Sequence, residues 1–110
     1  MGVRLGVFAL LALLATACSD SQSPRPPTLT DGFYMCQQFI TPRLRAPSSV
    51  KWPPRPHSQY VTKIDDTTFR ASAYLDAQNA FGAMIRTPFV CTVQHVVGDR
   101  WRLLDLQMHD

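Results

Sequence analysis

Beyond residue 30, the apolar side chains follow first a helical and then an alternating pattern. Phe33, Cys36, Ile40 and Leu44 recur at intervals of three and four residues. This spacing places them on one face of a helix. We therefore expect the domain to begin with a helix whose apolar face packs against whatever follows it in the chain.

Capping residues and prolines mark the two ends of this predicted helix. Thr30 and Asp31 offer an N-cap. Pro42 has no N–H donor and clashes with the preceding turn, so the helix is expected to kink or to end near Ile40. Pro47 ends it in any case.

Four segments with strand character follow a proline-rich crossing at residues 47–56. The clearest is 67–77, where apolar and polar residues alternate as they do in a strand with one buried face. The other three are 59–64, 83–97 and 101–108. Turn signals separate the four: Asp65-Asp66, Asn79 with Gly82, and Gly98-Asp99.

The last two strands carry irregularities. Pro88 lies inside the long segment 83–97, so we expect a bend there. In the last segment the apolar positions change parity at Leu103-Leu104, which leaves its register open. The order of elements predicts an α+β domain at residues 31–110, with one helix on one face of an antiparallel sheet of about four strands.

The first seventeen residues have a different character from the rest. Residues 1–17 contain one arginine, a long apolar run and small residues at the end, which is typical of a secretory signal peptide. The apolar stretch would form a helix of about 20 Å, whereas a bilayer core is about 30 Å thick. The alternative is a short core helix.

The small residues directly before Cys18 resemble the lipobox of bacterial lipoproteins. The family usually has leucine three residues before the cysteine, where this chain has Ala15. The resemblance implies that Cys18 is diacylated, becomes the mature N-terminus and anchors an exported chain to the cell envelope. Ser19 follows it, which in this family favours the outer membrane over the inner. Residues 18–30 are then the lipidated cysteine and a Pro/Ser-rich tether.

Cysteine counting supports a disulfide. Three cysteines in an exported chain would leave one odd thiol. With lipid on Cys18, Cys36 and Cys91 remain, and an oxidising compartment favours their pairing, which would tie the helix to the sheet. The alternative is a catalytic thiol, which needs a nearby base, and nothing beside either residue supplies one.

Several segments also resemble a small bacterial domain without an assigned activity. They are the helix around Cys36 and residues 44–53, 74–83 and 86–91, and the resemblance extends over about 33–106. Domains of this kind occur in secreted or membrane-anchored proteins, often behind a transmembrane helix or a zinc ribbon. The resemblance implies an extent and a fold, and it says nothing about chemistry.

Charge and length exclude several classes of function. Eleven basic residues against eight aspartates give a net charge of +3 over 110 residues. This surplus is too small for a strongly basic nucleic-acid-binding protein. The chain is also too short for a dinucleotide-binding fold.

A stretch without acidic residues, from 32 to 64, is the first candidate site. It contains Arg43, Arg45, Lys51 and Arg55, with Trp52 among them. Such a surface could bind anionic headgroups or a wall polymer. Alternatively it is a solvated face, with Trp52 closing the core beneath the proline-rich crossing.

The turn between the second and third strands is the second candidate site. Asp76, Asn79 and Arg86 could form a binding site there. Alternatively, Asp76 and Asn79 cap backbone amides, and Gly82 permits the tight path of the chain. The sequence leaves both interpretations open.

No motif predicts catalysis, a metal or a cofactor. His57, His95 and His109 lack metal-ligand spacing, and there is no nucleophile elbow or glycine-rich phosphate loop. We therefore expect a non-enzymatic, lipid-anchored module of the cell envelope. Its partner would be an envelope protein. The alternative is an envelope structural or stress factor whose basic segment engages an anionic lipid or a wall polymer. A small hydrolase is the remaining alternative.

Overall fold

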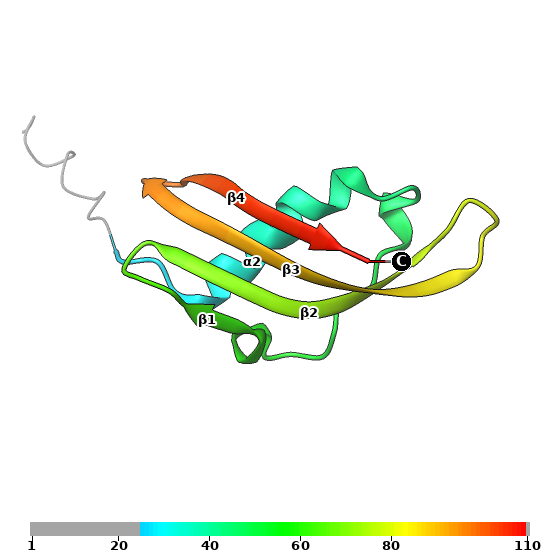
Figure 1. Cartoon of the computed structure of the whole chain (residues 1–110), viewed down its shortest axis with the longest axis horizontal. Helices are drawn as coiled ribbons and strands as arrows, with labels where there is room; N and C mark the ends of the chain where they lie inside the picture. Colours follow the sequence, from blue (N-terminus) through cyan, green and yellow to red (C-terminus); the bar gives the residue numbers. More distant parts are fainter. Residues whose placement is uncertain (1–24, 110) are drawn as a thin grey trace, which may run out of the picture.

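Helix α2 (Leu29–Ile40) lies across one face of a sheet built from β1 (Val61–Lys63), β2 (Thr68–Gln78), β3 (Met84–Val97) and β4 (Arg100–Met108). The four strands are antiparallel neighbours in chain order, as the computed structural model shows (Figure 1). This arrangement confirms the predicted α+β fold. The structure describes residues 25–109, so the signal segment, Cys18 and most of the predicted tether lie outside the described residues.

The start of α2 is set by a capping box. The Thr28 hydroxyl accepts the backbone N–H of Asp31, and the Asp31 carboxylate accepts the backbone N–H of Thr28. These reciprocal bonds satisfy two donors that the helix itself leaves free. The predicted N-cap at Thr30 is therefore wrong. Leu29 and Thr30, which the sequence assigned to the tether, belong to the first turn of the helix.

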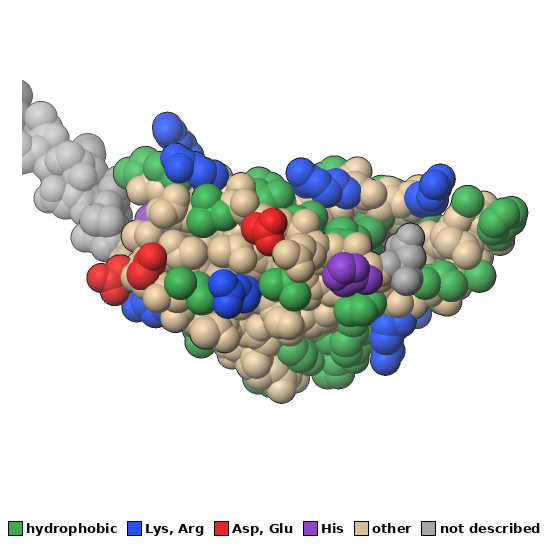
Figure 2. Space-filling model, in the orientation of Figure 1, with side chains coloured by type: hydrophobic (Ala, Val, Ile, Leu, Met, Phe, Trp, Pro, Cys, Tyr) green, Lys and Arg blue, Asp and Glu red, His purple; other side chains and the backbone are tan. Residues whose placement is uncertain are grey.

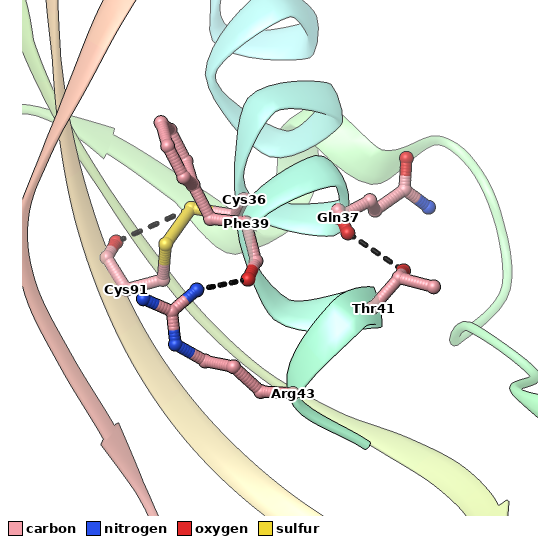
Figure 3. Close-up of a disulfide and its surroundings, with 6 residues drawn as sticks. All are labelled: Cys36, Gln37, Phe39, Thr41, Arg43 and Cys91. Atoms are coloured by element: carbon pink, nitrogen blue, oxygen red, sulfur yellow. Dashed lines mark hydrogen bonds between the residues drawn. A yellow bond between two sulfur atoms is a disulfide. The ribbon is translucent and has the colours of Figure 1, made fainter. Parts of the chain in front are cut away.

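The end of α2 lies at Ile40, where Pro42 led us to expect it. The chain continues into a 3₁₀ turn, and the Thr41 hydroxyl donates to the Gln37 carbonyl. The Arg43 guanidinium donates to another carbonyl of the last helical turn (Figure 3). The Gln37 carbonyl also accepts the backbone N–H of Thr41, so the side chains of Thr41 and Arg43 add further bonds to carbonyls at the end of the helix.

The core lies between α2 and the inner face of the sheet. Its members come from the predicted apolar faces of the helix and strands: Phe33, Cys36, Ile40, Phe69, Ala71, Leu75, Phe89, Cys91 and Val93. Half-buried Trp52 packs edge-on against Phe33 and Phe89, with ring centroids 6.1 Å away in each case. Trp52 therefore closes one end of this core.

A disulfide between Cys36 and Cys91 joins the helix to the central strand β3. The two Cα atoms are 6.1 Å apart, and both residues are fully buried (Figure 3). The sulfur of Cys36 also lies 3.6 Å from the Cys91 carbonyl oxygen. Because a disulfide sulfur carries no hydrogen, this is a packing contact. The predicted helix-to-sheet bridge is confirmed.

Strand β3 passes through Pro88 without interruption. All eleven residues of β2 pair with β3 in one continuous register. The carbonyl of Pro88 accepts the N–H of His109, so the backbone of this residue points away from β2. The missing proline N–H therefore costs the β2–β3 ladder nothing. β3 therefore has no bulge at Pro88, and the strand continues through the position where we expected a bend.

The parity change in the last strand is a β-bulge. Val93 faces Leu103, and Thr92 faces Asp105, so Leu104 has no partner on β3. The extra residue turns Leu104 outward, where 46% of its surface is exposed. Apolar side chains before and after the bulge can therefore stay on the inner face.

Candidate functional site

The β2–β3 hairpin continues past the end of α2 (Figure 1). A groove of about 430 Å³ lies between the inner face of this hairpin and the chain that follows the helix. Apolar side chains from four segments contribute to its lining: Leu44, Leu75, Ala77, Ile85 and Met108. The remaining lining residues are Arg43, Arg45, Gln78, Asn79 and Thr87.

Strand register explains the apolar part of the groove. Leu75 pairs with Thr87, and Ala77 pairs with Ile85, so all four side chains share the inner face of the hairpin. Leu75 is buried at 1% exposure, whereas Ile85 is 39% exposed. The inner face thus becomes accessible where the cover of the helix ends.

Two arginines lie at the groove. Arg43 and Arg45 are both exposed, and the Arg43 guanidinium is held by its hydrogen bond to the Phe39 carbonyl (Figure 3). Within residues 25–109, neither arginine forms an ion pair. An apolar surface beside two such guanidinium groups suits a ligand that combines an apolar group with an anionic one.

The other basic residues of the first candidate site lie elsewhere. Arg55 lines a separate hollow with Tyr34 and His57. Lys51 is exposed, and its backbone pairs with that of Asp76. The basic segment is therefore divided between two hollows and a bridge to the sheet.

The second candidate site contains a cross-strand ion pair. Arg86 donates to both carboxylate oxygens of Asp76, at 2.9 and 3.1 Å, and its guanidinium carbon lies 4.1 Å from the centre of the Tyr74 ring. Hydrogen bonding to Arg86 lowers the pKa of Asp76; partial burial opposes this, and the charges of Arg86 and Lys51 add to the lowering. The same bonding raises the pKa of Arg86. A carboxylate held in this way is poorly suited to act as a general base.

Asn79 organises the turn at the end of the hairpin. Its side-chain oxygen accepts the N–H groups of Phe81 and Ala83, at 2.9 and 3.0 Å. Gly82 has φ 83°, a conformation that favours glycine. Of the residues expected to cap backbone amides, Asn79 does so, whereas Asp76 pairs with Arg86 instead.

Two of the described histidines contact other groups of the fold. His57 stacks on Phe33 with ring centroids 4.3 Å apart, and a ring nitrogen of His95 lies 2.8 Å from the Gly98 carbonyl oxygen. Among residues 25–109, no three His, Cys, Asp or Glu side chains gather where they could hold a metal ion. In the same part of the chain, no helix is both long and apolar enough to span a membrane.

Several groove residues could not be assigned from the sequence. Ile85, Thr87 and Met108 belong to strands that were recognised, but nothing in their spacing shows where the helix stops covering the sheet. Strand alternation could have placed Ile85 on the same face as Ala77 once the hairpin register was known.

The chain matches no protein-family model, no curated protein and no solved structure. Its resemblance to lipoproteins and to a small envelope domain therefore stays a prediction.

Proposed function

We propose that this chain is a lipid-anchored protein of the cell envelope whose domain is a non-enzymatic binding module. The groove below the β2–β3 hairpin supports this proposal, because it combines an apolar lining with Arg43 and Arg45. Its partner would be an envelope protein that presents an apolar side chain next to a carboxylate. Gln78 and Thr87 add side chains that can hydrogen-bond to the backbone of such a segment.

Binding of an anionic wall polymer or lipid through the basic segment has less support. That function needs the basic residues to act on one surface. Arg43 and Arg45 line the groove, whereas Arg55 lines a separate hollow. A small hydrolase also has little support, since the Asp76 carboxylate is held by Arg86.

The lipid anchor is tested by mass analysis of the N-terminus with and without globomycin, which blocks lipoprotein signal cleavage. We expect a diacylated Cys18 without the drug and retention of residues 1–17 with it. Cys18→Ala is the control, and it should abolish the lipid mass. An unmodified N-terminus, or cleavage elsewhere, would refute the anchor.

The binding function is tested by photo-crosslinking in the intact envelope. A crosslinking residue at Ile85, in the groove, should capture a partner that the same residue at Val97 does not. Val97 is a matched control because it is 58% exposed and lies at the opposite end of β3. Equal capture at both positions would contradict the groove.

Charge reversal tests the role of the arginines. Arg45→Glu should weaken capture about tenfold or more, since it places a like charge against the anionic group of the partner. Arg100→Glu is the control, because it makes the same change of charge at an exposed position on β4. Unchanged capture by Arg45→Glu would exclude the proposed charge recognition.

A further inference from the structure

The end of the β2–β3 hairpin is apolar and exposed. We call residues 79–84 the hairpin tip. Phe81 is 93% exposed and Met84 is 45% exposed. Figure 2 shows hydrophobic side chains gathered at the end of the molecule where this hairpin lies. A large aromatic side chain so fully exposed on a folded turn is unusual, because it gains nothing from packing within the chain.

The tip contains no charged residue, and its base carries an ion pair. From Asp76 to Arg86 the intervening nine residues are all uncharged. Asp76 and Arg86 face each other across the two strands and neutralise one another. Four residues, 77–80, separate Asp76 from Phe81, and an extended chain of that length spans about 13 Å. That length exceeds the 5–10 Å to which interfacial elements typically enter a bilayer.

The backbone of the tip is bonded within itself. The N–H groups of Phe81 and Ala83 donate to the side-chain oxygen of Asn79. The N–H of Gly82 donates to the backbone carbonyl of Asn79, and the N–H of Asn79 donates to the carbonyl of Ala83. A polar group that enters lipid without a partner carries a large penalty. This turn can therefore leave water without exposing those four N–H groups.

The charges nearby favour an anionic lipid surface. Between Asp66 and Asp99 the sole carboxylate is Asp76, which Arg86 already pairs. Arg43 and Arg45 are exposed at the groove beside the base of the hairpin. Cationic groups next to an inserting apolar element are attracted by anionic headgroups.

We propose that the hairpin tip inserts into the interfacial layer of a lipid bilayer, with Phe81 as the deepest side chain. A convex tip with internally bonded backbone fits a fluid lipid surface better than a protein surface, which would need a matching pocket. Insertion rests neither on the groove nor on lipidation of Cys18.

The test uses the full chain, purified from membranes and reconstituted into vesicles of phosphatidylethanolamine and phosphatidylglycerol. Phe81→Trp supplies a fluorescent indole at the hairpin tip, which we call the tip probe. Val97→Trp supplies a matched indole at the other exposed turn, which we call the control probe. The signal of the unsubstituted protein, from Trp52 and Trp101, is subtracted. Because Phe81 contacts so little of the fold, thermal unfolding of the Phe81→Trp variant should match that of the unsubstituted chain.

We expect the emission of the tip probe to shift to shorter wavelength in vesicles. Most of this emission should be lost when the lipids carry a quencher high on the acyl chain. The control probe should show neither change and should stay accessible to iodide. If iodide quenches the tip probe equally with and without vesicles, the proposal is overturned. A shift of the tip probe to shorter wavelength that the acyl-chain quencher leaves undiminished would overturn it as well, because the tip would then contact protein rather than lipid.

Discussion

Gly32 of helix α2 lies directly against Phe69 of strand β2. A Cβ atom at position 32 would be 3.0 Å from the Cβ of Phe69 and 3.2 Å from its Cγ. Both residues are buried, and Phe69 is 1% exposed. A glycine inside a helix is unfavourable by itself, by about 1 kcal/mol relative to alanine. Its role here is to let the helix approach the sheet closely.

Substitution of Gly32 tests this contact. Gly32→Ala should lower the free energy of unfolding by about 1–2 kcal/mol, because overpacking against Phe69 outweighs the gain in helix propensity. Urea unfolding measures the change. Gln38→Ala is the control, since Gln38 is exposed on the same helix and should change little. A more stable Gly32→Ala variant would show that the helix can move away at no cost.

The disulfide should supply a large part of the stability. Cys36 and Cys91 are 55 residues apart, and a closed loop of that length stabilises by about 4 kcal/mol in the chain-entropy treatment. Cys36→Ala with Cys91→Ala should therefore unfold at much lower urea concentration. Reduction of the unsubstituted protein is the matched experiment and should give a similar loss. An unfolding midpoint that reductant leaves unchanged would contradict the bridge.

The capping box predicts different effects at two nearby threonines. Thr28→Ala should lower the free energy of unfolding by about 1 kcal/mol, because it removes the acceptor of the Asp31 N–H. Thr30→Ala should change it little, since the side chain of Thr28, not that of Thr30, caps the helix. Thermal unfolding of the two variants measures the difference. A larger effect at Thr30 would show that Thr30 caps the helix, as the sequence predicted.

The cross-strand pair predicts a change in a titration curve. Arg86→Met should raise the pKa of Asp76 toward its ordinary value of 3.8, because the hydrogen bonds from the guanidinium are lost. NMR titration of the carboxyl carbon measures this pKa. Lys63→Met is the control, since Lys63 pairs with Asp66 instead. No change at Asp76 in the Arg86 variant would show that the pair does not persist in solution.

Stability should fall in acid. The pKa values of Asp31, Asp65 and Asp76 are lowered below 3.8 in the folded chain. For Asp31, partial burial acts in the opposite direction, but hydrogen bonds from Thr28 and the charge of Arg25 outweigh its effect on the pKa.

A carboxylate with a lowered pKa stabilises the fold fully above its unfolded pKa, and this contribution is lost as pH falls through the lower folded value. The free energy of unfolding should therefore decrease once the pH drops below 3.8. Urea unfolding as a function of pH measures it, and Asp31→Asn should make the decrease smaller. Equal stability at neutral pH and at about pH 3 would contradict these three lowered pKa values.

Local patterns along the chain predicted the helix and the order of the four strands, although residues 59–60 of the first predicted strand belong to the 3₁₀ helix His57–Tyr60. The spacing of Phe33, Cys36 and Ile40 predicted the buried helix face, and Pro42 predicted its end. Both follow from geometry that operates within one turn of a helix. The cap was misplaced because several Thr and Asp residues stand close together, and their sequence alone did not show which pair bonds reciprocally.

The groove and the hairpin tip depend on contacts between residues far apart in the sequence, which no local pattern contains. Ala77 and Ile85 meet because of the register of a long hairpin, and the groove opens because α2 stops short of that hairpin. Arg43 and Arg45 reach the same place from a different part of the chain. The sequence grouped them instead with Arg55, which lies in another hollow.

By itself, the sequence determined the α+β class and the faces that form the core, because periodicity depends on short-range geometry. It also predicted the helix-to-sheet disulfide, because Cys36 and Cys91 are the two cysteines that remain once Cys18 is set aside. The tertiary structure alone decided where Leu104 bulges, how closely Gly32 approaches Phe69 and which charged side chains meet. These features arise from strand register and from the relative lengths of helix and hairpin. Both are set by packing across the whole domain rather than by neighbouring residues.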